Sequence, residues 1–72
     1  MYEFTITTVQ APVVAVLERA GFIINRVVGY DDENGPTVFM SRRRRGTTFY
    51  AEVDPNGDVN GMDSNAFMQG LK

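Results

Sequence analysis

The sequence contains no cysteine and no histidine among its 72 residues. Without cysteine the chain has neither a disulfide nor a thiolate that could bind metal or attack a substrate. Without histidine it lacks the commonest general base and the commonest metal ligand. Catalysis would rest on Asp, Glu, Tyr, Ser or Arg, and no pair of these is spaced to suggest a site. We therefore predict that the protein is not an enzyme and has no catalytic residues and no cofactor.

Long apolar runs are also absent. The longest, "APVVAVL", is far shorter than the roughly 20 residues that a membrane-spanning helix needs. The first ten residues alternate between polar and apolar and do not form a signal peptide. We expect a soluble, cytoplasmic protein that does not enter a membrane. Its length predicts a single domain, residues 1–72, near the lower limit for an independent core.

Metal-binding patterns are incomplete in this chain. "DPNGDVNGMD" offers the oxygen ligands Asp54, Asn56 and Asp58. An EF-hand loop that began at Asp54 would need glycine at its sixth position and glutamate at its twelfth, where Val59 and Asn65 stand. A hairpin turn explains the stretch better, with proline second and glycine fourth in "DPNG". We predict no metal site.

The apolar pattern that is present predicts an α+β fold. Alternation at residues 2–8 indicates a strand, and residues 11–22 form a helix with Pro12 in its first turn and Gly21 at its C-terminal cap. Further strands are expected at residues 22–30, 37–41 and 47–53, and a short helix at residues 63–72. A short return strand at residues 58–62 is an alternative that would add a fourth strand after the first helix. The order β-α-β-β-β-α with short connections predicts a small antiparallel sheet of three to five strands, with the helices packed on one face.

Spacing and residue type also predict a core. In the first helix we expect a buried stripe of Val13, Val16, Leu17 and Ala20. In the second helix we expect Asp63 or Ser64 to be the N-cap and Phe67, Met68 and Leu71 to contact the sheet. Among the strand aromatics, we expect Phe39 and Phe49 to pack in the core and Tyr50, which points the other way from Phe49, to face solvent.

The most distinctive feature of the sequence is a run of four arginines, Arg42–Arg45, in a chain of net charge −2. A strand that continued through this run would place alternate arginines on opposite faces. Burial of an unpaired guanidinium is prohibitively costly. The strand must therefore leave the core near Ser41 or project beyond it as a ribbon. In both cases we predict a solvent-exposed hairpin tip that Gly46 closes.

The acidic run Asp31–Glu33 should not neutralise these arginines. The two runs stand at opposite ends of one predicted strand, and about eight extended residues span roughly 25 Å. This separation exceeds the Debye length of about 8 Å at physiological salt. The arginines are therefore available to bind a partner. The alternative is that they contact only solvent and keep the protein soluble.

Two kinds of partner fit the arginine tip. Arginine forms bidentate bonds to carboxylate and phosphate, and arginine with aromatic residues is typical of protein interfaces. We favour a non-enzymatic protein-binding module that docks on an acidic or nucleic-acid-binding partner surface, of the size of small adaptors and virus-encoded inhibitors. The alternative is a nucleic-acid-binding module, which the net negative charge opposes. An exposed edge strand leaves room for a homodimer. The predicted partner-binding residues are Arg42, Arg43, Arg44, Arg45 and Tyr50.

Overall fold

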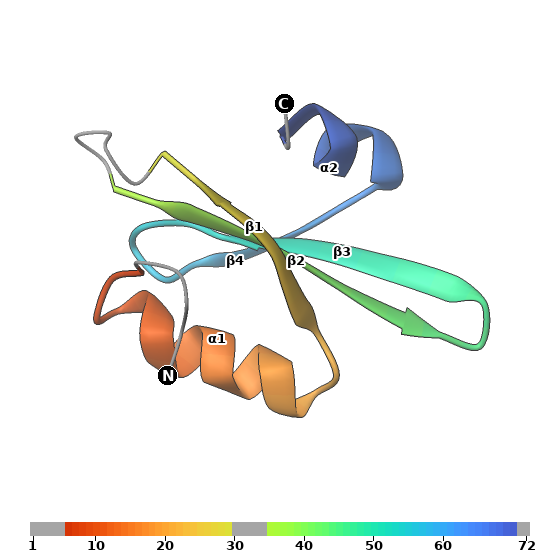
Figure 1. Ribbon diagram of the computed structural model, residues 1–72, viewed down its shortest axis with the longest axis horizontal. Coiled ribbons are helices and arrows are strands. Elements are labelled where there is room, and N and C mark those ends of the chain that lie inside the picture. The colour runs from red at the N-terminus through yellow and green to blue at the C-terminus, as the bar shows by residue number, and fades with distance from the viewer. Residues whose placement is uncertain (1–5, 30–34, 71–72) are drawn as a thin grey trace.

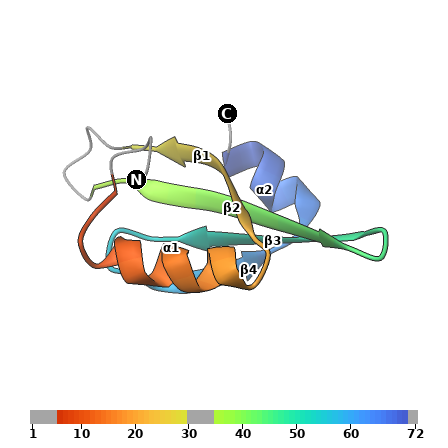
Figure 2. The same cartoon turned by 60° about the horizontal axis from the view of Figure 1, so that its bottom comes forward.

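The structure, a computed structural model, describes residues 6–29 and 35–70, which form an antiparallel sheet with one helix on each face (Figures 1 and 2). In chain order the elements are α1 (Gln10–Arg19), β1 (Ile23–Val28), β2 (Thr37–Arg44), β3 (Thr47–Val53), β4 (Val59–Met62) and α2 (Ser64–Gly70). The predicted α+β class is confirmed. Of the strand expected at residues 2–8, residues 2–5 lie outside the described part, and residues 6–8 are not in a strand.

The sheet is a meander in which each strand pairs with the next, in the order β1-β2-β3-β4. All three pairs are antiparallel, as the short connections predicted. The register between β1 and β2 shifts between Ile24 and Arg26, which is a β-bulge at Asn25. No helix in the described part of the chain is long and apolar enough to cross a membrane.

The two helices lie on opposite faces of the sheet, which differs from our expectation of one face. Figure 2 shows α1 on one side of β2 and α2 on the other. The cause is in β2, where Val38, Phe39 and Met40 are all buried although successive side chains point to opposite faces. A strand that is apolar on both faces needs a cover on each.

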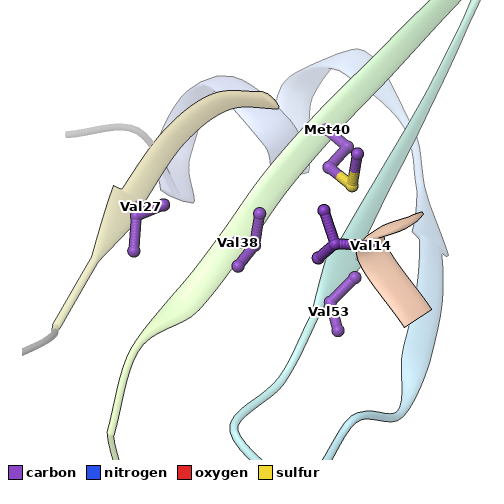
Figure 3. Packing of buried hydrophobic residues seen from close by; sticks show 5 residues of the cluster. All are labelled: Val14, Val27, Val38, Met40 and Val53. Atoms are coloured by element: carbon purple, nitrogen blue, oxygen red, sulfur yellow. The ribbon is translucent and has the colours of Figure 1, made fainter. Parts of the chain in front are cut away.

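The main core lies between α1 and the sheet (Figure 3). It consists of Val14, Val27, Val38, Met40 and Val53. On the opposite face, Phe67 of α2 packs edge-on against Phe39, with ring centroids 5.8 Å apart. Phe39 and Phe67 are therefore core residues, as predicted.

Val13 and Leu17 of the predicted stripe pack against the core. Three apolar helix residues predicted to be buried, Val16, Ala20 and Met68, are exposed. Val16 is 59% exposed, because the buried line of α1 runs through Gln10 and Val14 and residue 16 lies about 200° around the helix from residue 14. Met68 is 58% exposed, because the short α2 buries only the side of the helix that carries Phe67. Leu71 lies outside the described residues.

The predicted caps at the end of α1 and at the start of α2 are confirmed, although α1 spans Gln10–Arg19 and not residues 11–22. At the end of α1, Gly21 has a φ of 102°, and the N–H groups of Gly21 and Phe22 donate to the carbonyls of Glu18 and Leu17. This is the Schellman arrangement. At the start of α2, Asp63 Oδ1 accepts a hydrogen bond from Ala66 N–H at 2.8 Å.

The N-terminal end of α1 is closed by a capping box. Thr7 Oγ1 accepts from Gln10 N–H at 3.0 Å, and Gln10 Oε1 accepts from Thr7 N–H at 3.0 Å. The side-chain amide of Gln10 is fully buried, and its two N–H groups are shared among the carbonyls of Pro36, Val53 and Asp54, which lie 2.6, 3.2 and 2.9 Å from Nε2. One amide therefore ties the start of α1 to the start of β2 and the end of β3.

Candidate functional site: an arginine-rich hairpin

The four arginines lie on the hairpin formed by β2 and β3. Arg42, Arg43 and Arg44 are the last residues of β2, and Arg45 and Gly46 form a two-residue turn. Their φ angles are 52° and 80°, both positive. Positive φ at both central residues defines a type I′ turn, whose twist matches that of paired strands. Glycine meets this requirement freely, whereas Arg45 adopts the left-handed conformation at a cost.

The hairpin projects beyond both helices as a two-stranded ribbon. β2 continues in regular pairing with β3 through Arg44, which is paired with Thr47. In Figures 1 and 2 the turn between β2 and β3 lies at one end of the molecule, past the ends of α1 and α2. Of the two arrangements that the sequence allowed, the structure has the ribbon. Arg43, Arg44 and Arg45 are exposed and Arg42 is half-buried.

The ribbon presents arginine on both faces. Strand alternation places Arg42 and Arg44 on the face of Met40, which is the α1 side. Arg43 lies on the face of Phe39, which is the α2 side. The guanidinium groups therefore spread around the ribbon, with Arg45 at its tip, and do not form a flat patch.

No described residue forms a salt bridge with the hairpin. Within residues 6–29 and 35–70, Arg42–Arg45 form no salt bridge and no side-chain hydrogen bond. The acidic residues Asp54 and Asp58 follow β3 at its far end, and seven strand residues cover about 23 Å. Salt screens charges at that distance. We expected the acidic run Asp31–Glu33 at the opposite end of the strand from the arginines. This run lies outside the described residues.

Arg42 differs from the other three arginines in its surroundings. A β-carbon placed on Gly21 would stand 3.5 Å from Arg42 Nε and 3.6 Å from its Cδ, so the side chain lies alongside Gly21. Gly21 follows the last turn of α1, where the helix macrodipole is negative and favours a cation. The stem of Arg42 is thus positioned by the body of the protein.

The two neighbouring aromatic residues of β3 take the opposite positions from those predicted. Phe49 is 52% exposed and is paired with Arg42 on the α1 side, so the prediction that it is a core residue is wrong. Its position on the projecting ribbon takes it past the helix that would have covered it. Tyr50 is half-buried, with its ring centroid 4.4 Å from that of Phe67. The return of α2 over the other face covers Tyr50.

The other stretch considered for metal binding is a turn. Gly57 N–H donates to Asp54 carbonyl at 2.9 Å, and Asp54 Oδ1 accepts from the N–H groups of Asn56 and Asp58 at 2.9 and 3.0 Å. The Asp54 carboxylate therefore serves the turn. Among the described residues, no group of three or more His, Cys, Asp or Glu side chains is placed to hold a metal ion.

Both outer strands carry features that oppose pairing with another sheet. The outer strand β1 contains the bulge at Asn25, and the four-residue β4 is flanked by Asp58 and Asp63. Bulges, short length and charge are the devices by which natural sheets protect their edges. Homodimerisation through an edge strand stays a prediction, which concentration-dependent light scattering tests.

At the site, sequence reasoning placed Phe49 and Tyr50 wrongly, and at the other end of the sheet it missed Gln10. For Gln10 the signal was present, since "TTVQ" matches the Thr-x-x-Gln capping box ahead of an apolar run. For Phe49 no local signal existed, because its exposure depends on where α1 ends relative to the ribbon. Comparison of the chain with known protein families, curated proteins and solved structures found no match. The functional argument therefore depends on the residues of this chain.

Proposed function

We propose that this chain is a small, non-enzymatic binding module that docks on the acidic surface of a partner protein through the hairpin Arg42–Arg45. The observation that carries the proposal is the ribbon itself. It extends past both helices and carries four guanidinium groups that form no salt bridge with a described carboxylate. Adjacent like charges repel, and a partner with carboxylates removes that repulsion.

An exposed aromatic residue on the ribbon supports a protein partner. Phe49, which is paired with Arg42 on the α1 side, is 52% exposed. Arginine and aromatic residues are enriched where proteins meet. The module would suit an adaptor or an inhibitor, which needs one contact surface and no catalytic group.

The proposal is tested by affinity capture from nuclease-treated native extract. The wild-type chain is compared with a variant in which Arg42–Arg45 are all alanine, and with a second in which they are all lysine. We expect one protein that the wild type retains and the alanine variant loses, with the lysine variant intermediate because lysine keeps charge but not bidentate geometry. Arg19→Ala, which removes an exposed positive charge from α1, is the control. Equal recovery by the wild type and the alanine variant would contradict the proposal.

A second candidate, a nucleic-acid-binding module, is favoured by one observation. Arg42 and Arg44 point to one side of the ribbon and Arg43 to the other. The major groove of DNA is about 12 Å wide, admits a two-stranded ribbon and is bounded by phosphates on both sides. Arginine on both faces suits such a groove.

This candidate predicts a steep salt dependence. Four arginine–phosphate contacts would give a slope of log K against log salt of about −3.6 on duplex DNA. The measurement is an electrophoretic mobility shift with duplex DNA and duplex RNA across a range of salt concentrations. Absence of a shift at low salt would eliminate the candidate.

A further inference from the structure

The two faces of the hairpin are not equivalent. On the α1 side, Phe49 is directly paired with Arg42 and is exposed. On the α2 side, Tyr50 is paired with Ser41 and lies against Phe67. Directly opposed residues on one face have Cβ atoms about 5 Å apart. Only the α1 side therefore offers an uncovered aromatic ring and a guanidinium as neighbours.

Arg42 is also restrained before any partner arrives. Its stem lies alongside Gly21 at the negative end of α1, and the residue is half-buried. Arg43, Arg44 and Arg45 are exposed and have no such contact among the described residues. A restrained side chain loses less conformational entropy on binding than a free one.

On the basis of the function proposed above, we propose that Arg42 and Phe49 form the centre of the contact, and that Arg43–Arg45 mainly speed association. The matching site on the partner protein is a carboxylate beside an apolar pocket, which receive the guanidinium and the phenyl ring respectively. Binding energy at interfaces is concentrated in a few central residues, often aromatic or arginine, in desolvated pockets. Charges at the rim act on the association rate and its salt dependence.

The asymmetry of the faces favours a protein over a nucleic-acid groove for this contact. A groove with phosphates on both walls would use Arg42 and Arg43 alike and would gain little from one exposed phenyl ring at the base of the ribbon. A one-sided contact uses Arg42 with Phe49 and leaves Arg43 at the rim. Adjacent arginines on opposite faces thus give a matched pair of test positions.

The test uses three defined probes and fluorescence anisotropy. The probes are an oligoglutamate peptide, a peptide of equal charge in which glutamate alternates with leucine, and a duplex RNA. We expect the Glu–Leu peptide to bind more tightly than oligoglutamate. Phe49→Ala should weaken Glu–Leu binding about tenfold and abolish this preference, because it removes the residue that fills an apolar pocket. Ile23→Ala, which removes an equally exposed apolar side chain on the other face, should change it less than about twofold.

The arginine pair completes the test. Arg42→Ala should weaken Glu–Leu binding about tenfold, through faster dissociation, whereas Arg43→Ala should weaken it less than about threefold, through slower association. Equal effects of the two substitutions, or no effect of Phe49→Ala, would overturn the inference. Tighter binding of duplex RNA than of either peptide would overturn it in favour of nucleic acid.

A further variant separates the two proposals. If replacement of all four arginines by alanine leaves peptide binding unchanged, the proposed function itself fails. If that variant loses binding while Phe49→Ala does not, only the division between centre and rim fails. Phe49, Arg43 and Ile23 are exposed and Arg42 is half-buried without a hydrogen-bond partner among the described residues, so circular dichroism should show that the single variants keep the fold.

Discussion

The two ends of the sheet differ in how their polar side chains are satisfied. At one end, the buried amide of Gln10 makes hydrogen bonds to three backbone carbonyls, and every described buried side-chain polar atom has a partner. At the other end, the hairpin Arg42–Arg45 carries guanidinium groups without a partner among the described residues. At the Gln10 end, buried hydrogen bonds join α1, β2 and β3. At the hairpin end, the side chains are mostly exposed and contribute little to the core.

This difference indicates where stability and binding reside. Removal of a buried hydrogen-bonding group leaves its partners unsatisfied, at a cost of about 1–3 kcal/mol each. Changes at exposed positions usually alter the free energy of unfolding by less than about 0.5 kcal/mol. Substitutions in the hairpin should therefore alter binding with little loss of stability, whereas substitutions at the Gln10 end should lower stability. Four variants test this contrast.

The largest effect is expected from Gln10→Ala. It should lower the free energy of unfolding by about 2–4 kcal/mol, because the carbonyls of Pro36, Val53 and Asp54 lose a buried donor. Urea titration followed by circular dichroism measures the change. Thr8→Ala, at an exposed neighbouring position, is the control and should be near neutral. A loss below about 1 kcal/mol would mean that the amide does not hold this end together.

Thr7→Ala should cost about 1 kcal/mol, because it removes the hydroxyl that accepts from Gln10 N–H. Thr7→Ser keeps this hydroxyl and should restore most of the stability. The same titration measures both. If serine and alanine were equivalent, the capping box would contribute nothing.

At the hairpin end, Arg45→Asn should raise the free energy of unfolding by about 0.5–1 kcal/mol. Asparagine tolerates the left-handed conformation that Arg45 adopts at a φ of 52°, and Asn-Gly is the preferred pair in type I′ turns. Arg44→Asn, one residue earlier in extended β2, should not stabilise. Stabilisation by both variants would attribute the gain to charge instead of turn geometry.

Replacement of all four arginines by alanine should change the free energy of unfolding by less than about 0.5 kcal/mol. The side chains are mostly exposed, and relief of like-charge repulsion offsets the lost packing of Arg42 against Gly21. Thermal and urea unfolding of this variant provide the measurement. A loss above about 2 kcal/mol would show that the hairpin supports the core, and the contrast between the two ends would not hold.

Much of the local structure could be predicted from the sequence. Gly21 at the end of α1, the turn Asp54–Gly57 and the exposed hairpin around Gly46 follow from residue types whose backbone preferences act over a few positions. The placement of α2 could not be predicted, because the pattern of residues 64–70 shows an apolar side but not the face of the sheet that receives it. The apolar residues on both faces of β2 were the available signal.

By itself the sequence determined the class of fold and an uncovered arginine tip, because alternation, turn chemistry and the cost of burying charge are local or general. The strand order came from the structure. Only the tertiary structure decided which of two neighbouring aromatic residues is free. Phe49 and Tyr50 point to opposite faces in any strand, but Phe67 of α2 covers Tyr50, whereas Phe49 is exposed on the α1 side. The same is true of Arg42, which is positioned by Gly21, a residue twenty-one positions earlier in the chain.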